Sequence, residues 1–308
     1  MSPKQTHCAA ATRAGYTLVV LLGATTAALA APAHPPEFWR TLKQQQFKLA
    51  PGQSAAELAS EATQLLGSTD PEVRDGIAYE ALFDWVYGEQ LLSAAQLEQL
   101  RDQLAPNAVR GLGGAGDDSL FLRSFSILAL SVLAAEDLQR PFLTPEHYAG
   151  LVDLGIQSLT QERDLRGYVA GKGWGHATAH AADLLKFLAR SPKLQPAQQQ
   201  RIVGAVATRL KTAGVVFVWG EDARLAATLA SVARRADADP ANFSGWFDEL
   251  RAAHHRVWDG PFDPALYVAE RAQLNALAQL SLNLDSDPAA AGSPAIRELL
   301  RLLSRDLR

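Results

Sequence analysis

The spacing of the apolar residues constrains this chain more than any other feature of its sequence. Along most of its length, apolar side chains recur at steps of three and four residues, as in Phe121, Phe125, Leu128 and Val132. This spacing places them on one face of an α-helix, whereas a strand would alternate apolar and polar residues. Only residues 214–219 read as a strand or as the start of a buried helix. The sequence therefore predicts an all-α protein.

Proline follows a capping residue at several predicted helix starts. The three examples are Asp70-Pro71, Thr144-Pro145 and Asp263-Pro264. Asp and Thr side chains accept hydrogen bonds from the free amides of a first helical turn. Proline is tolerated at the first helical position because its missing N–H would have no partner there. These pairs predict where three of the helices begin.

An acidic residue shortly before an arginine recurs near predicted helix starts, at intervals of roughly fifty residues. The pairs are Asp70 and Arg74, Asp118 and Arg123, Asp164 and Arg166, and Asp222 and Arg224. Residues 65–74 resemble the start of a HEAT repeat, in which such side chains tie neighbouring helical pairs together. We therefore expect a single-domain, HEAT-like stack of helical hairpins, either an open solenoid or a closed α/α ring.

Residues 1–30 have the features of a secretory signal peptide. Lys4 and Arg13 make the start basic, no charge occurs over residues 15–30, and the stretch ends at the small-x-small sequence Ala28-Leu29-Ala30. The apolar centre is too short for a comfortable membrane span. The alternative is an uncleaved N-terminal anchor. We expect export to the periplasm or to the cell exterior.

Cleavage near Ala30 would remove Cys8, the only cysteine in the sequence. The exported protein would then form no disulfide, and its stability would come from its core. The chain has a formal net charge of −4, which argues against nucleic acid or an anionic membrane as the main partner and favours a small molecule or a peptide. Nothing in the sequence indicates an oligomeric state. The expected segments are a signal peptide (1–30), a linker with the first helix (31–52) and an all-helical repeat domain (53–308).

The densest group of chemically unusual residues lies at residues 164–183. Several glycines between residues 167 and 175 allow tight turns and a close approach of the backbone to a ligand. Arg166 and Lys172 flank these glycines and could hold a carboxylate or a phosphate. In the structural alternative, Arg166 pairs with Asp164 or with an acid of another repeat.

Two aromatic residues belong to the same segment. Tyr168 and Trp174 could stack on a sugar or on another ring, or they could belong to the core. A helix is expected to begin near Trp174 or Gly175. Residues 164–183 are therefore predicted to build a binding pocket at the start of that helix.

His176, His180 and Asp183 fall within a narrow sector of the predicted helix face. Two imidazoles one turn apart and a carboxylate are a suitable donor set for a divalent transition metal. Such a metal could activate a water molecule for attack on a substrate. Alternatively, the histidines bond to neighbouring backbone or to Asp164, or one histidine performs acid–base chemistry without a metal.

Two further acids follow Trp219-Gly220 in the sequence. If their helix folds beside the histidine helix, Glu221 or Asp222 could complete the site as a catalytic base. The structural alternative is capping of that helix, a role to which Asp is well suited.

Several stretches resemble a bacterial family known only as a domain of unknown function, catalogued as two-seven-eight-five. The central ones are Asp164-Leu165-Arg166-Gly167-Tyr168, Gly173-Trp174-Gly175-His176 and His180-Ala181-Ala182-Asp183-Leu184-Leu185, and others lie at residues 67–75, 123–126 and 220–226. The resemblance implies an all-helical, HEAT-like fold without an established activity. Many members carry no signal peptide, so the export signal departs from the family pattern.

Three functions remain open from the sequence. The first is a non-catalytic module that binds a ligand or a protein in a pocket on residues 164–183. The second is a metal-dependent hydrolase that uses His176, His180 and Asp183. The third is a purely structural scaffold. The direction of the imidazole nitrogens, toward a cavity or toward backbone carbonyls, separates the chemical readings from the structural one.

Overall fold

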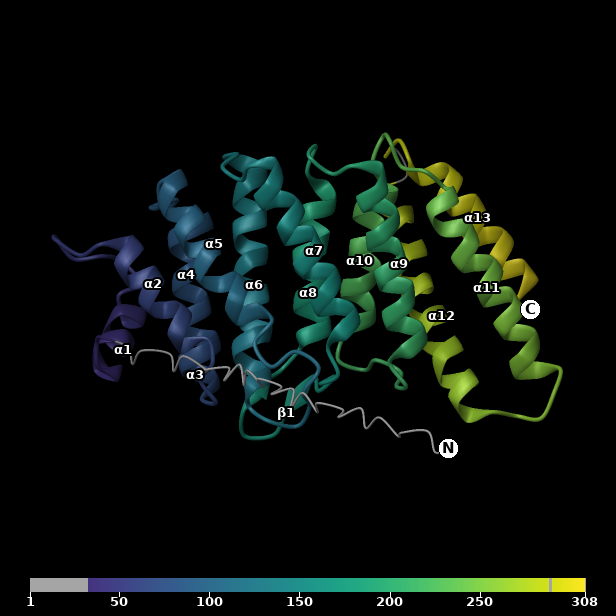
Figure 1. The fold of residues 1–308 in the computed structure, drawn as a ribbon, viewed down its shortest axis with the longest axis horizontal. Coiled ribbons are helices and arrows are strands. Elements are labelled where there is room, and N and C mark those ends of the chain that lie inside the picture. Colours follow the sequence, from purple (N-terminus) through teal and green to yellow (C-terminus); the bar gives the residue numbers. More distant parts are fainter. Residues whose placement is uncertain (1–32, 288–289, 308) are drawn as a thin grey trace, which may run out of the picture. The chain divides into compact units, whose positions relative to one another are not determined.

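The computed structural model describes residues 33–287 and 290–307. Over these residues the protein is all-α except for a two-stranded antiparallel hairpin, β1 (Tyr168–Val169) and β2 (Gly173–Trp174), as Figure 1 shows. This confirms the all-α part of the predicted fold class. The predicted signal peptide, residues 1–30, lies outside the described residues.

Helices follow one another along the described chain, and the connection between α7 and α8 carries the hairpin. They are α1 (Pro36–Gln44), α2 (Ala55–Leu65), α3 (Pro71–Val73), the π-helical η1 (Arg74–Tyr79), α4 (Glu80–Phe83), the π-helical η2 (Asp84–Gly88), α5 (Ala94–Ala108), α6 (Ser119–Gln139), α7 (Pro145–Gln161), α8 (Ala177–Arg190), α9 (Pro196–Thr212), α10 (Glu221–Ala233), α11 (Ala241–Trp258), α12 (Pro264–Asp285) and α13 (Ser293–Asp306). From α3 to η2 the helical backbone is continuous.

Consecutive helices pack in pairs, and the pairs pack on one another. Helix α5 contacts α6, α7 contacts α8, α9 contacts α10, and α11 contacts α12. Helices α6, α8, α10 and α12 also contact one another in that order, as do α5, α7, α9 and α11 (Figure 1). From α5 to α12 the helices therefore form two contacting rows, and α8 lies between α6 and α10.

The three predicted proline starts are helix starts in the structure. Asp70 Oδ1 accepts a hydrogen bond from the Glu72 amide at 2.9 Å, and Asp263 Oδ1 accepts one from the Ala265 amide at 2.8 Å. Thr144 caps α7 in the same way. Each helix has its proline in the first turn, so the local sequence alone determines these boundaries.

Helix α6 forms the centre of the core. By length and composition it is the one described helix apolar enough to cross a membrane, yet 89% of its most apolar stretch is buried inside the fold. It packs most extensively on α8 and α5. A helix that is covered on nearly all sides is expected to be apolar all round, so packing accounts for its composition.

The strand-or-helix prediction for residues 214–219 was wrong. These residues form an irregular connection between α9 and α10, and they pair with no other described segment. Phe217 is buried, whereas Val218 and Trp219 are 74% and 49% exposed. Helix α10 begins only at Glu221, after Gly220 in the left-handed conformation. The apolar residues of this connection therefore differ in burial, and they do not form one continuous strand.

Candidate functional site

Two glycines of the predicted site bring backbone close to side chains of the protein itself. A Cβ atom on Gly167 would lie 2.2 Å from the ring of Trp219, and one on Gly173 would lie 2.8 Å from the Pro71 side chain. Gly173 also has a φ of +76°, which disfavours other residues. The glycines therefore allow the β1–β2 hairpin to pack between the α9–α10 connection and the start of α3.

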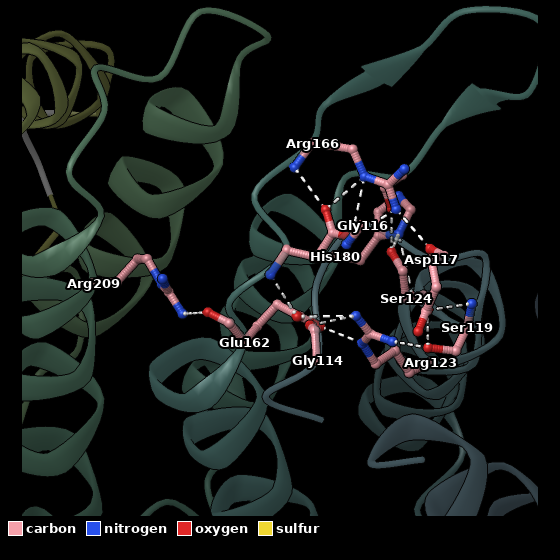
Figure 2. Close-up of polar contacts among 12 residues, drawn as sticks. Gly114, Gly116, Asp117, Ser119, Arg123, Ser124, Glu162, Arg166, His180 and Arg209 are labelled. Carbon is pink, nitrogen blue, oxygen red and sulfur yellow. Dashed lines mark hydrogen bonds and ion pairs between the residues drawn. The ribbon is translucent and has the colours of Figure 1, made fainter. Parts of the chain in front are cut away.

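Arg166 is paired with Asp164, as the structural alternative predicted. Its Nε and Nη2 atoms donate to the Asp164 carboxylate at 2.8 and 2.6 Å, and Nη2 also donates to the carbonyl oxygen of Asp117 (Figure 2). Burial acts to raise the pKa of Asp164, but the bonds from Arg166 and from the Gly116 amide outweigh it and lower that pKa. The pair anchors the start of the hairpin segment.

Lys172 is also engaged by the protein. Its Nζ atom lies 2.7 Å from both carboxylate oxygens of Asp118, at the start of α6. Its carbonyl oxygen accepts a hydrogen bond of 2.8 Å from Nη2 of Arg74, whose side chain is fully buried. Both cations predicted to hold a ligand thus neutralise internal acids, which leaves neither one uncompensated.

Buried arginines connect neighbouring helical segments below the hairpin. The Arg74 guanidinium lies over the rings of Phe121 and Phe125 of α6, at 4.3 and 4.7 Å from their centroids. Arg123 of α6 forms a buried ion pair with Glu162, which follows α7 (Figure 2). Sequence reasoning identified the two arginines but missed Glu162, because no local pattern marks it as a partner.

Three large rings gather at the surface around the hairpin. Tyr168, Trp174 and Trp219, called here the aromatic platform, are 50%, 38% and 49% exposed. Their ring centroids lie 5.2 to 6.1 Å apart, and Trp174 stacks on the His176 ring at 4.3 Å. Clustered exposed rings are typical of binding surfaces rather than of cores.

His176 lies beside a buried acid at the edge of the platform. Its φ of 51° is left-handed, and its amide donates to the Arg166 carbonyl oxygen at 3.1 Å. Its Nε2 atom is buried, lies 3.8 Å from Glu221 Oε1 and has no hydrogen-bond partner among the described residues. The other Glu221 oxygen accepts a bond from the Trp219 amide at 3.0 Å. Helix α10 therefore lies beside the histidine helix, which was the condition for Glu221 to take part in the site.

The surroundings of the His176–Glu221 pair favour its neutral forms. Burial lowers the pKa of His176 and raises the pKa of Glu221. A separation of 3.8 Å is too long for a hydrogen bond between them. The pair can accept a hydrogen bond from a ligand hydroxyl or donate one to it, and it can hold or release a proton. Asp222, the other acid considered, accepts a bond from the neighbouring Ala223 amide at the start of α10.

His180 has a structural environment. It is 6% exposed, and its Nδ1 atom lies 2.8 Å from the hydroxyl oxygen of Ser124 and 3.2 Å from the Ser124 carbonyl oxygen (Figure 2). Burial, followed by the charges of nearby groups, lowers the pKa of His180 to about 3. The imidazole is therefore neutral and fixes α8 against α6.

The structure does not gather His176, His180 and Asp183 around a common point. His176 lies before the first residue of α8 with a left-handed backbone, and its ring lies 5.9 Å from the His180 ring between centroids. The Asp183 carboxylate binds Lys186 at 2.7 Å and also binds Arg224. Over residues 33–287 and 290–307, no group of three or more His, Cys, Asp or Glu side chains could hold a metal ion.

Together these features define an all-α protein with an exposed aromatic platform beside a buried imidazole–carboxylate pair. The chain belongs to the family described as Protein of unknown function (DUF2785), whose model matches residues 109–282, more than half of the chain. This range includes the hairpin, the platform and the His176–Glu221 pair. No curated protein and no solved structure matches the chain significantly.

Proposed function

We propose that this protein is an exported, non-catalytic binding module, made of HEAT-like helical hairpins, that takes its ligand on the aromatic platform. One observation carries the proposal: three half-exposed rings lie beside a buried imidazole nitrogen that has no described partner. The rings offer flat apolar area. The nitrogen and the adjacent Glu221 carboxyl offer polar groups that a ligand could satisfy.

The chemistry of the platform favours an uncharged, ring-shaped ligand with hydroxyl groups, such as a sugar. The apolar face of such a ring can stack on Trp174 or Trp219. A hydroxyl can bond to the buried His176 Nε2 once the Trp174 ring that stacks on this histidine moves aside. Arg166 and Lys172 are neutralised by their own acids, so neither of these two cations is free to select an anion. An open surface with few polar groups also favours modest affinity.

The scaffold in this proposal is a stack of HEAT-like repeats. Its support is the pairwise packing of the helices, together with the buried Arg74 and Arg123 that connect successive segments. In a repeat stack each helical pair buries its apolar face against its neighbours, which gives a rigid support for an exposed site.

Export is part of the same proposal. The basic start, apolar centre and small residues of residues 1–30 support it, as does the lack of cysteine from residue 31 onward. The test is N-terminal sequencing of protein recovered from the periplasm or the medium, which should begin at Ala31. Full-length protein that remains in the membrane fraction would contradict cleavage and favour the anchor.

The two other functions have less support. The metal-dependent hydrolase needs a donor set, whereas Asp183 holds two cations and His180 bonds to Ser124. A pure scaffold gives no reason to hold three large rings exposed at one place, since exposed apolar area is costly in solution. Ligand binding gives a role both to the exposed rings and to the unpartnered His176 nitrogen, so it is the function that we prefer.

The experiment is a titration of the protein with glucose, galactose, N-acetylglucosamine, maltose and cellobiose. Binding is measured by calorimetry and by tryptophan fluorescence. We compare the wild type with Trp174→Ala and with Trp258→Ala, a control that removes a more exposed indole on α11, away from the platform. The expected result is binding of at least one sugar, weakened about tenfold by Trp174→Ala and unchanged by Trp258→Ala. If no sugar binds the wild type, or if both variants bind equally well, the proposal fails.

A further inference from the structure

A cavity separate from the aromatic platform opens between the segment from η1 to η2 and helices α6, α8 and α10. Its volume is about 360 Å³, at the small end of the range for ligand pockets. Side chains from four helical segments that are distant in sequence line it, among them Tyr87, Phe187 and Arg224. No part of the proposed function depends on this cavity.

The cavity contains one more positive charge than negative charge. Its single carboxylate, Asp183, has a side chain that is 3% exposed, and it serves both Lys186 and Arg224. His180, which also lines the cavity, is neutral for the reasons given above. One carboxylate shared by two cations leaves a net charge of +1 to be met by solvent or by a ligand.

Arg224 is the cation with free donors. Its side chain is 52% exposed, and Nη1 binds Asp183. Among the described residues, this is the only hydrogen bond recorded for its guanidinium. An arginine that one nitrogen fixes in place can present the others as a planar fork to a carboxylate.

Further positive charge continues along α8 and α10. Arg190 donates to the Ser231 hydroxyl at 3.2 Å, and no described carboxylate lies within ion-pair distance of it. Partial burial and the charge of Arg234 lower the pKa of Arg190, which shows that its surroundings do not favour a second cation. Arg190 does not line the cavity, so the net charge of the cavity itself stays at +1.

The remaining wall of the cavity is aromatic and apolar. Phe83, 45% exposed, lies 5.6 Å from Tyr87 between ring centroids, and Phe187 faces the cavity from α8. Lys186 lies over the Phe187 ring at 4.4 Å. The cavity therefore has a cationic end and an apolar wall, which suits a molecule that has one charged group and an apolar body.

We propose that this cavity binds a small organic monocarboxylate, with its carboxylate on Arg224 and Lys186 and its apolar body against Phe83, Tyr87 and Phe187. A net charge of +1 matches a monoanion better than a phosphate dianion, because a dianion would leave one negative charge uncompensated beside Asp183. The volume limits the ligand to a body of roughly one aromatic ring or a short acyl chain.

The test is calorimetry with phenylacetate and hexanoate, each compared with its neutral amide, and with inorganic phosphate. The wild type should bind at least one acid at least about tenfold more tightly than the matching amide or phosphate. This comparison requires no mutation. Equal binding of acid and amide, tighter binding of phosphate, or no binding of either acid at about 10 mM would overturn the proposal.

Substitutions at the cavity test whether the acid binds there. Arg224→Gln should weaken acid binding about tenfold. Arg201→Gln, which removes an exposed arginine paired with Asp153 on the surface, should leave it unchanged. Circular dichroism and thermal melting establish that Arg224→Gln is folded. If it is not, Arg224→Lys retains the charge, loses the fork and should still weaken binding. Acid binding that none of these variants changes would place the ligand elsewhere and refute the assignment.

Discussion

Gly167→Ala tests whether the hairpin is built to hold the aromatic platform. The new Cβ would lie 2.2, 2.5 and 2.8 Å from Cδ1, Cγ and Cβ of Trp219. These atoms are at the root of the indole, so the ring cannot avoid them by a simple rotation, and backbone must shift. Overpacking of this kind costs about 1–3 kcal/mol. For a domain of this size, that corresponds to a decrease in Tm of about 2–6 °C.

The measurements are thermal and urea unfolding of the wild type, Gly167→Ala and a control. The control, Gly204→Ala, lies within α9, where an added Cβ meets no atom within 4 Å. Because alanine is the better helix former, it should stabilise the protein by about 0.5–1 kcal/mol. The two glycine-to-alanine changes are therefore expected to have opposite signs.

A double-mutant cycle assigns the cost to the indole. In a Trp219→Ala background the two contacts with ring atoms are gone and only the contact with Cβ at 2.8 Å remains, so Gly167→Ala should cost clearly less than it does in the wild type. If the cost is the same in both backgrounds, or if Gly167→Ala is as stable as the wild type, the proposed contact between hairpin and platform is refuted. Gly167→Ala should also weaken any sugar binding that Trp174→Ala weakens, because it displaces the neighbouring ring.

Two other predictions concern the interior. His180 has a pKa of about 3 in the folded protein and about 6.5 in the unfolded chain, so its neutral form supports folding above pH 6.5, and that stability is lost as the pH falls toward 3. Urea unfolding at pH 7.5 and 4.5 (chosen to bracket the unfolded value) should show a smaller loss in His180→Gln than in the wild type, and equal losses would refute this. Arg123→Leu should lower the free energy of unfolding by about 3–5 kcal/mol, because it leaves the buried Glu162 carboxylate without its partner. The double variant with Glu162→Leu should recover much of that cost, and a merely additive result would contradict a direct ion pair.

Local chemistry made a large part of this fold predictable from the sequence. The period of the apolar residues determines the helices, and the proline caps determine three of their starts, because both act within a few residues along the chain. The same locality explains why the pairing of Arg166 with Asp164, two residues away, could be foreseen as an alternative.

Features that depend on tertiary contacts could not be predicted in this way. Trp219 joins Tyr168 and Trp174 only because α10 packs beside α8. Glu162 becomes the partner of Arg123 for a similar reason. The left-handed backbone of His176 at the start of α8 could not be predicted either, because periodicity carries no information about a single residue of this kind.

The bond from Arg74 to the Lys172 carbonyl oxygen has a practical consequence for anyone who trims this chain. The family match begins at residue 109, yet Pro71 and Arg74 contact the hairpin that carries Tyr168 and Trp174. A fragment that contains only residues 109–282 would lose the contacts of Pro71 and Arg74 with the hairpin. It would also expose the rings of Phe121 and Phe125, which Arg74 covers. The shortest fragment that preserves the platform must therefore begin before Ser68, whose carbonyl oxygen accepts a hydrogen bond from Nη1 of Arg74.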